Sequence, residues 1–539
     1  MMNKWQYSNS QSLNIPNTGI YLWIQALVIF GMAFYIRYRF MDWPLRFDEY
    51  YHILAARSWA IDGSFSILDG EYRRAPLFTI LVGWLFSIFG ESIEIARLPS
   101  LLAGSLNVLL IFFFVNRQVG IIAAWISSLL FIFDPGSIDL STQVRFYTIQ
   151  GVLFWLAAIL LFYGSHQSVS LHLRLGMVLI IVPALMLAKH LQPITLIGIA
   201  GLVVWIIFEH GAKLAGIIRR FSLTHTAFTV FIGVSVCAFI FLLRDDIGNI
   251  LERYKSAPYW LQEAKDRPLY YHSLLMSQYP LLWSFFPIAA LLALRSYKRI
   301  VGYCFVMFIT LLLLHSFAGS KLLRYFNYAF PFLFIIWGIF LAGMFQASRN
   351  SLLDTISGRL GGYRQTIANL SVIILFSYSI LSINFHTYHQ TKRSMHQSEM
   401  DIGGWASAES LLKQLADHVD IVMVTDNNRA IYYIGRYDYA ITPSLIRGTD
   451  TGREFGKDLR NGGHIIAKPQ SISRILDCTD SGLFVSGQKR WNAIGEEGID
   501  ILLERTREIQ TPGELGLIVR SWRSPNRNHV PECEDLPRR

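Results

Sequence analysis

Long apolar segments recur from residue 18 to residue 385, and they limit the fold of the 539-residue chain more than any other feature. A helix needs roughly 20 mostly apolar residues to cross the hydrocarbon core of a bilayer. By this criterion we expect about eleven spans, near residues 18–38, 98–116, 120–134, 147–164, 175–189, 192–208, 226–243, 280–294, 299–317, 327–346 and 367–385. Only 16% of the residues are charged, against roughly 25% in soluble proteins, which also favours a membrane protein.

One further apolar segment, Pro76–Phe89, is too short for a full span. If it does not cross the membrane and the amino terminus is cytoplasmic, the most basic loops all lie in the cytoplasm, as the positive-inside rule requires. These loops carry Arg117, Arg174, Lys213, Arg219, Arg220, Arg295, Lys298, Arg299, Arg349, Arg359 and Arg364. We therefore predict an interfacial or re-entrant helix at Pro76–Phe89. The outer side then receives residues 39–97, 135–146, 244–279, 319–325 and the chain after about residue 386.

The chain becomes more polar after residue 390, and segments typical of strands and helices alternate there. We expect strands at Ile421–Thr425, His464–Ala467, Leu483–Val485 and Leu517–Trp522, and helices at Asn428–Ile434, Ser471–Leu476 and Gly498–Ile509. Such alternation predicts a small α/β domain. The predicted fold is thus a polytopic α-helical membrane protein with a membrane domain at residues 1–390 and a soluble extracytoplasmic α/β domain at residues 391–539.

Charge and cysteine content exclude some classes of function. The net charge is +10, but the basic residues are spread over short loops, so nucleic acid is not an expected partner. Cys237 and Cys304 lie in apolar segments, and none of the four cysteines has the spacing of a zinc site. Cys478 and Cys533 lie in the C-terminal region, where they can pair.

An acidic pair, Asp48-Glu49, directly follows the first span. Carboxylates so close to a bilayer are candidates for function, because burying an unpaired charge is costly. The alternative is a solvated pair outside the lipid, or pairing of Asp48 with Arg46 or Arg97. As a functional group, either carboxylate can act as the general base that removes a proton from a hydroxyl.

Basic residues in the outer segments suggest a phosphate as the second ligand. Sugar nucleotides are largely confined to the cytoplasm, and enzymes on the other side use sugars carried by a polyprenyl phosphate. Cations placed in advance stabilise such a leaving phosphate, and arginine can do so with two hydrogen bonds. The candidates are Arg73, Arg74, Lys321 and Arg324.

These basic residues also have simpler interpretations. Lys321 and Arg324 would share one face if a helix began there, but they could equally anchor the tenth span at the interface with Tyr325 and Tyr328. Arg97 and Arg145 open the second and fourth spans, the latter followed by Tyr147, and they are either boundary charges or supports for the acidic loop. A few outer rings, Tyr50, Tyr51 and Tyr271, can stack on a sugar.

Four motifs in order resemble those of GT-C glycosyltransferases, above all protein O-mannosyltransferases and the aminoarabinose transferases that modify lipid A. The similarity covers most of residues 18–346. The motifs are Phe47-Asp48-Glu49 with Ala55-Ala56 and Gly63, then Arg74-Ala75-Pro76-Leu77, then Gly90-Glu91 through Arg97-Leu98-Pro99-Ser100, and finally Lys321-Leu322-Leu323-Arg324-Tyr325 with Pro331.

The resemblance implies inverting transfer from a polyprenyl-phosphate sugar. The charge pattern puts the acceptor hydroxyl at the outer face, and the inner (plasma) membrane of a bacterial envelope is the location we prefer. The resemblance also implies Asp48 as the base with Glu49 beside it, and Arg74, Lys321 and Arg324 near the lipid phosphate. The expected partners are this donor, the bilayer, and a glycan, lipid or protein acceptor. No cofactor is firmly implied, and a divalent cation stays open.

The chain departs from the family pattern in one place. Those families often carry a second acid about five residues after an arginine of the second outer loop, and from Arg145 that count reaches Gln150. Either one acid suffices or Asp139 substitutes from a shifted position, while Asp134 is also out of register. Two alternative functions remain: a polysaccharide or lipid transporter, which would more often show internal repeats, and a ligase that moves a whole glycan.

Overall fold

The computed structural model describes residues 19–166, 169–219, 267–318, 321–356, 404–441, 454–458, 460–466, 468–511, 516–523, 533 and 536–537. Contacts group the chain into two compact units: unit 1 is Met1–Met41 with Arg97–His389, and unit 2 is Asp42–Ala96 with Gln390–Arg539. The first outer loop thus belongs with the C-terminal region by its contacts. The domain boundary at residue 390 stays a prediction.

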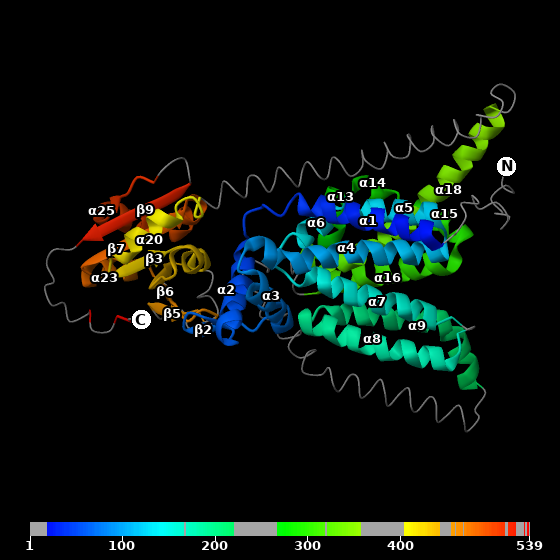
Figure 1. Ribbon diagram of the computed structural model, residues 1–539, viewed down its shortest axis with the longest axis horizontal. Coiled ribbons are helices and arrows are strands. Elements are labelled where there is room, and N and C mark those ends of the chain that lie inside the picture. Colours follow the sequence, from blue (N-terminus) through cyan, green and yellow to red (C-terminus); the bar gives the residue numbers. More distant parts are fainter. Residues whose placement is uncertain are drawn as a thin grey trace. The chain divides into compact units, whose positions relative to one another are not determined.

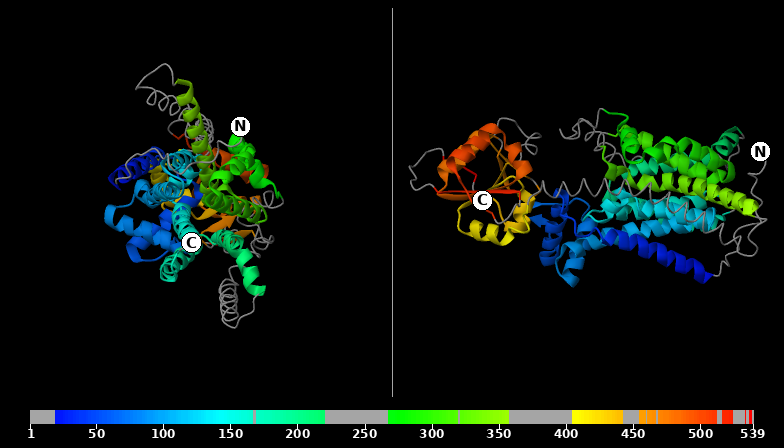
Figure 2. Two further views of the ribbon diagram at one scale, coloured as in Figure 1. Left: turned by 90° about the vertical axis from the view of Figure 1, so that its right-hand side faces the viewer. Right: turned by 90° about the horizontal axis from the view of Figure 1, so that it is seen from above.

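Unit 1 is a bundle of apolar helices (Figures 1 and 2). Its elements are α1 (Gly19–Tyr38), α4 (Ile93–Gln118), α5 (Ile121–Ile132), α6 (Pro135–Ser141), α7 (Tyr147–Gly164), α8 (Leu171–Leu191), α9 (Thr195–Arg219), α13 (Tyr270–Gln278), α14 (Pro280–Ser284), α15 (Phe286–Ser296), α16 (Lys298–Ser316), α17 (Leu323–Phe326), η2 (Asn327–Ala329) and α18 (Phe330–Ile356). Every predicted span that falls within the described residues coincides with helix. The predicted spans 226–243 and 367–385 lie outside them, as does Cys237.

Six of the described helices are long and apolar enough to cross a membrane, or seven if a bent pair counts as one span. The bent pair is α5 and α6, whose axes differ by 64°. Two predicted spans are shorter or broken: the segment at 280–294 divides into α14 and α15, and α9 is apolar only over part of its length. The predicted fold class is confirmed, although the described part shows fewer full-length spans than predicted.

The helix ends meet as the predicted up-and-down order requires. Arg299 at the start of α16 pairs with Glu209 of α9, with Nε 2.9 Å from Oε1, and its Nη2 donates to the carbonyl of Phe162 near the end of α7 over 2.6 Å. At the opposite end of α7, the Gln150 amide donates to Oγ1 of Thr195 at the start of α9 over 3.1 Å. Ends predicted to share a side of the membrane therefore lie together.

Unit 2 contains the first outer loop as α2 (Phe47–Asp62), a hairpin of β1 (Ser66–Ile67) and β2 (Gly70–Glu71), and α3 (Pro76–Phe89). The predicted short helix is confirmed as α3. Its exposed face is apolar, with Leu77, Leu81, Trp84 and Ile88, which fits an interfacial helix. A Cβ on Gly83 would lie 2.9 Å from the carbonyl of Ala56, so glycine lets α3 approach α2 closely.

The C-terminal region forms an α/β sheet of order β5-β6-β4-β3-β7-β9-β8. The elements are α20 (Glu409–Asp417), β3 (Ile421–Val424), α21 (Asn427–Arg429), η4 (Ala430–Ile434), β4 (Tyr439–Ile441), β5 (Phe455–Lys457), β6 (His464–Ile466), α23 (Pro469–Cys478), β7 (Ser481–Gly487), α24 (Gln488–Trp491), η5 (Asn492–Ile494), α25 (Glu496–Arg505), β8 (Arg507–Glu508) and β9 (Leu517–Arg523). Strands β6, β4, β3 and β7 are parallel. In Figure 2 the orange helices and the yellow helix cover opposite faces of the sheet.

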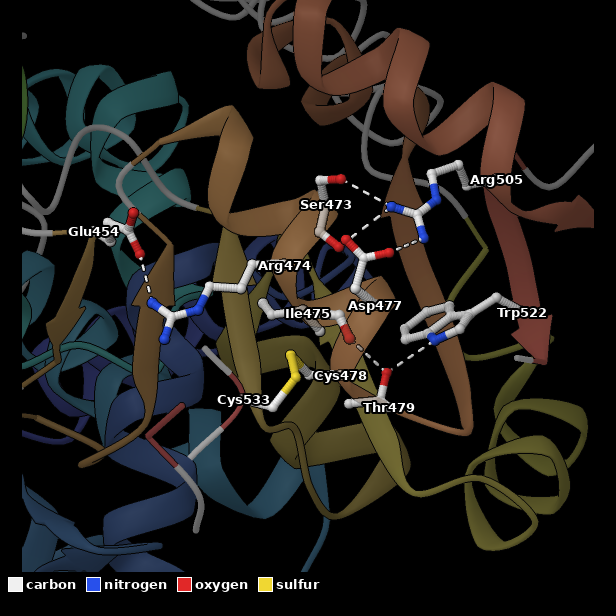
Figure 3. Close-up of a disulfide and its surroundings, with 10 residues drawn as sticks. All are labelled: Glu454, Ser473, Arg474, Ile475, Asp477, Cys478, Thr479, Arg505, Trp522 and Cys533. Carbon is white, nitrogen blue, oxygen red and sulfur yellow. Dashed lines mark hydrogen bonds and ion pairs between the residues drawn. A yellow bond between two sulfur atoms is a disulfide. The ribbon is translucent and has the colours of Figure 1, made fainter. Parts of the chain in front are cut away.

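A disulfide ties the carboxyl-terminal end of the chain to this sheet (Figure 3). Cys478 at the end of α23 is bonded to Cys533, as the sequence allowed, with 5.4 Å between their Cα atoms. The hydroxyl of Tyr439 then donates to the carbonyl of Pro537 over 2.7 Å. Cys304, which lies in an apolar segment, is buried and free in unit 1.

Candidate active site

The acidic pair lies in the first turn of α2, where its two carboxylates have different surroundings. Glu49 is 1% exposed, and its Oε1 accepts a hydrogen bond from the backbone N–H of Arg46 over 2.9 Å. This is the second half of a capping box, which satisfies an N–H group that the helix itself leaves unbonded. Asp48 is only half-buried. Of the two acids, Asp48 is therefore the more exposed.

The rings that follow the pair are not exposed. Tyr50 and Tyr51 are 2% and 1% exposed, because residues of the C-terminal region pack over them. Tyr50 contacts the ring of Tyr433, with 6.2 Å between centroids, and the Tyr51 hydroxyl donates to Oδ2 of Asp458 over 3.4 Å. Burial raises the pKa of both phenols. The expectation that they stack on a sugar is wrong, since their faces are already covered.

The Arg74-Ala75-Pro76-Leu77 motif forms the entry to α3. Ala75 has a φ of 47°, a left-handed conformation that is costly for a residue other than glycine, and Pro76 takes the first helical position. The two arginines before it are both exposed, and Arg73 forms an ion pair with Glu71, 2.6 Å apart. The predicted role of Arg74 in phosphate binding stays a prediction.

In unit 1, two predicted arginines share one aromatic cluster, which consists of Arg145, Tyr147, Arg324 and Tyr325. Arg145 donates from Nη2 to the hydroxyl of Tyr147 over 3.1 Å. The guanidinium carbon of Arg324 lies 6.0 Å from the centre of the Tyr147 ring and 5.5 Å from that of Tyr325. Arg145 and Tyr147 are nearly fully buried, while Arg324 and Tyr325 are half-buried. Two cations and two phenols thus converge at the start of α7 and at α17.

Lys321 lies just before this cluster but not on its helix. Helix α17 begins only at Leu323, after an extended Leu322, so the helical face predicted for Lys321 and Arg324 does not form. The ammonium of Lys321 is buried and donates to the carbonyl of Arg267 over 3.2 Å. Tyr271 is also buried and donates to the carbonyl of Leu322 over 3.2 Å, so it too is not an exposed ring for sugar binding.

Arg97 braces the base of the first outer loop. It is 1% exposed, and its Nη1 donates to the carbonyl of Met41, the residue at which the chain leaves unit 1 for that loop. Arg97 itself marks the return of the chain to unit 1. The side chain therefore joins the two ends of the loop. The supporting role of Arg97 in the site stays a prediction.

A buried polar cluster in unit 1 was not predicted from the sequence. Asp134 lies at the bend between α5 and α6, where it accepts hydrogen bonds from the backbone N–H of Ser137 and from the hydroxyl of Tyr279. Arg37 of α1 donates to Oγ of Ser137 over 2.7 Å and to Oγ of Ser141 over 3.1 Å. This cluster orients α6, the helix that carries Asp139.

Gln150, which occupies the position of the missing second acid, has a structural role. Gln150 is 2% exposed, and its bond to Thr195 joins α7 to α9. Asp139 is half-buried on α6, which packs beside α17: a Cβ on Gly136 would lie 3.5 Å from the Leu323 side chain. Among the described residues, no group of three or more His, Cys, Asp or Glu side chains is arranged to hold a metal ion.

Comparisons with known proteins agree with this architecture. Residues 73–239 match the family model of dolichyl-phosphate-mannose-protein mannosyltransferase. No curated protein sequence gives a significant match. Among solved structures, ArnT from Cupriavidus metallidurans bound to undecaprenyl phosphate has 15% identity and a TM-score of 0.57, covering 93% of this chain and 97% of its own. The apo form of that protein has a TM-score of 0.58 at the same identity and coverage.

A more distant similarity extends over the same length. The archaeal oligosaccharyltransferase AglB from Archaeoglobus fulgidus, in complex with an inhibitory peptide and a dolichol-phosphate, has 11% identity and a TM-score of 0.54. It covers 94% of this chain and 75% of its own. The chain therefore has the GT-C fold, and the resemblance that the four motifs suggested is confirmed.

Proposed function

We propose that the protein is an integral membrane glycosyltransferase that moves a sugar from a polyprenyl-phosphate donor to an acceptor hydroxyl with inversion. The observation that carries this proposal is the cluster of Arg145 and Arg324 with Tyr147 and Tyr325. Guanidinium groups held between rings in a partly buried site bind phosphate through charge-assisted hydrogen bonds. The ligands of the two solved relatives, undecaprenyl phosphate and a dolichol-phosphate, have the headgroup that such a cluster would recognise.

The residues have distinct roles in this mechanism. Asp48 takes the proton of the acceptor hydroxyl, whose oxygen forms a bond to the anomeric carbon of the sugar. The bond from that carbon to the phosphate oxygen breaks, and polyprenyl phosphate leaves with the electron pair. Arg145 and Arg324, with Arg74 and Lys321 as further candidates, stabilise the negative charge on the leaving phosphate. Glu49 stabilises the first turn of α2 and does not contact a reacting atom in this mechanism.

The disulfide supports an extracytoplasmic position for the C-terminal region. Disulfides persist in oxidising compartments and are rare in the cytosol, and Cys478 is bonded to Cys533. This agrees with the topology in which residues after the last span are outside. We place the reaction at the outer face of the inner (plasma) membrane.

The test compares cell-envelope glycans and lipids by mass spectrometry from cells that carry the wild-type protein or Asp48→Asn at equal levels. We expect one sugar to be missing from one species in the variant, which would identify both the donor sugar and the acceptor. Loss of a whole oligosaccharide would instead indicate the ligase reaction, to which the similarity with AglB also points. Unchanged envelope glycans would contradict a role of Asp48 in any transfer.

A further inference from the structure

The first turn of α2 is held by side chains of the C-terminal region, all within unit 2. The carbonyl of Leu45 accepts a hydrogen bond from Nη2 of Arg429 over 3.4 Å, and that of Phe47 accepts one from Nδ2 of Asn428 over 3.4 Å. The guanidinium carbon of Arg490 lies 5.3 Å from the centre of the Phe47 ring. These contacts lie on either side of Arg46 and immediately before Asp48. They therefore hold the backbone from which the Asp48 side chain extends.

Arg429 is itself held by a buried ion pair. Its Nη1 pairs with Asp426, whose side chain is 1% exposed while that of Arg429 is 6% exposed. Asp426 follows β3 and caps α21 by accepting the backbone N–H of Arg429 over 3.3 Å. Both ends of the arginine fork are therefore used, one inside the C-terminal domain and one on the outer loop. A buried ion pair contributes little net stability, but it can specify a single arrangement.

Further contacts along the same loop make the arrangement continuous. The guanidinium carbon of Arg429 also lies 5.4 Å from the centre of the Tyr50 ring, and that of Arg460 lies 4.5 Å from the centre of the Tyr51 ring. Beyond α2, a Cβ on Gly70 would lie 2.4 Å from the backbone nitrogen of Gly462. The outer loop is thus packed against the C-terminal domain at both α2 and the β1–β2 turn.

We propose that the C-terminal α/β domain positions the Asp48 carboxylate for reaction, and that Arg429, held by Asp426, is the positioning residue. This rests on the proposed function, in which Asp48 is the base. Misplacing a reacting group by about 1 Å can reduce a rate on the order of 100-fold. In this proposal the C-terminal domain contributes to catalysis by positioning Asp48.

Arg429→Lys separates positioning from folding. A lysine keeps the positive charge beside Asp426, so the buried carboxylate is not left unpaired, but a single ammonium does not reproduce the fork that also reaches Leu45. The matched control is Arg505→Lys in the same domain, where the arginine bonds both Ser473 and Asp477. Each variant is measured as the full chain in lipid nanodiscs, beside the wild type.

Two measurements decide the outcome. We expect amide hydrogen exchange in residues 45–51 to rise in Arg429→Lys, and kcat to fall about 10- to 100-fold with the donor KM within about twofold of the wild type. Arg505→Lys should change neither. Arg490→Gln, which loosens Phe47 without disturbing a buried charge, should show the same pattern more weakly.

The inference would be overturned by wild-type kcat in Arg429→Lys, or by unchanged exchange in residues 45–51. A loss of donor affinity equal to the loss of kcat would also contradict it, because that indicates general damage to the protein. Failure of the proposed function looks different, since the wild-type protein would then transfer no sugar at all.

Discussion

Asp48→Asn and Glu49→Gln should separate the two acids that the sequence places side by side. Both changes replace a carboxylate by an amide of nearly equal size, so packing is preserved. The amide oxygen of Glu49→Gln can still accept the backbone N–H of Arg46, now 2.9 Å from Oε1 of Glu49. Asp48→Asn keeps the helix but removes the group that takes a proton.

The expected magnitudes follow from these contacts. Since the capping acceptor is retained, Glu49→Gln should lower the free energy of unfolding by less than ~1 kcal/mol. Asp48→Asn should lose at most ~1 kcal/mol through its weaker interaction with the helix dipole. Loss of a positioned general base, however, should reduce kcat by about 10²- to 10⁴-fold, which corresponds to ~3–5 kcal/mol of barrier.

Transfer by the purified protein in nanodiscs, with a polyprenyl-phosphate sugar and the acceptor found in the envelope comparison, measures kcat. Thermal unfolding checks that both variants are folded, and binding of polyprenyl phosphate should be unchanged in both. If Glu49→Gln lost turnover while Asp48→Asn kept it, the assignment of the base to Asp48 would be wrong. If both retained turnover, Asp139 would be the next acid to test.

Three further predictions concern other parts of the chain. Arg324→Ala should weaken binding of undecaprenyl phosphate on the order of 10- to 100-fold, as measured by native mass spectrometry. The control Arg117→Ala, at an exposed position in the last turn of α4, should bind like the wild type. Equal binding by the two variants would contradict the phosphate site. Gly462 has a φ of 73°, and a Cβ there would lie only 2.4 Å from the backbone of the β1–β2 turn, so Gly462→Ala should lower the melting temperature through ~3 kcal/mol of backbone strain and steric overlap. The control Gly435→Ala also has a positive φ but open space around the Cβ, so it measures the backbone strain alone. Equal losses of stability in the two variants would show that steric overlap contributes nothing at Gly462. Cys533→Ser removes a cross-link that spans 55 residues and should lower the free energy of unfolding by ~4 kcal/mol. An unchanged thermal unfolding curve would show that the chain-entropy argument does not apply.

Much of the fold could be predicted because its signals are local. A long apolar segment needs a helix in lipid, whatever its neighbours are, and the described spans agree with that rule. The strand at Ile421–Thr425 and the helix at Ser471–Leu476 likewise agree with β3 and α23. The strand at Tyr439–Ile441 was missed, because three residues are too few to show a period. The predicted helix Gly498–Ile509 ends at Arg505, where the chain turns into β8.

The site was only partly predictable, because its contacts join distant residues. Nothing local indicates that Tyr51 lies under Asp458, more than 400 residues away, so a ring that looked available is buried. The Asp-Asn-Asn-Arg segment after β3 was not singled out, although polar residues at the carboxyl end of a parallel strand often carry function. Its partner, the outer loop, could not be inferred from that position alone.

The second acid shows how far a family pattern can be carried over. The position that the count from Arg145 reaches is Gln150, and its amide joins α7 to α9 through Thr195 inside the bundle. A carboxylate there would be buried and would have to give up or replace that bond, at a cost that a neutral amide avoids. The position is therefore used for packing, and the proposed chemistry depends on Asp48, with Asp139 as the remaining acid of the loop at 135–146. Because α6 packs beside α17, an acid on α6 belongs to the part of unit 1 that carries Arg324.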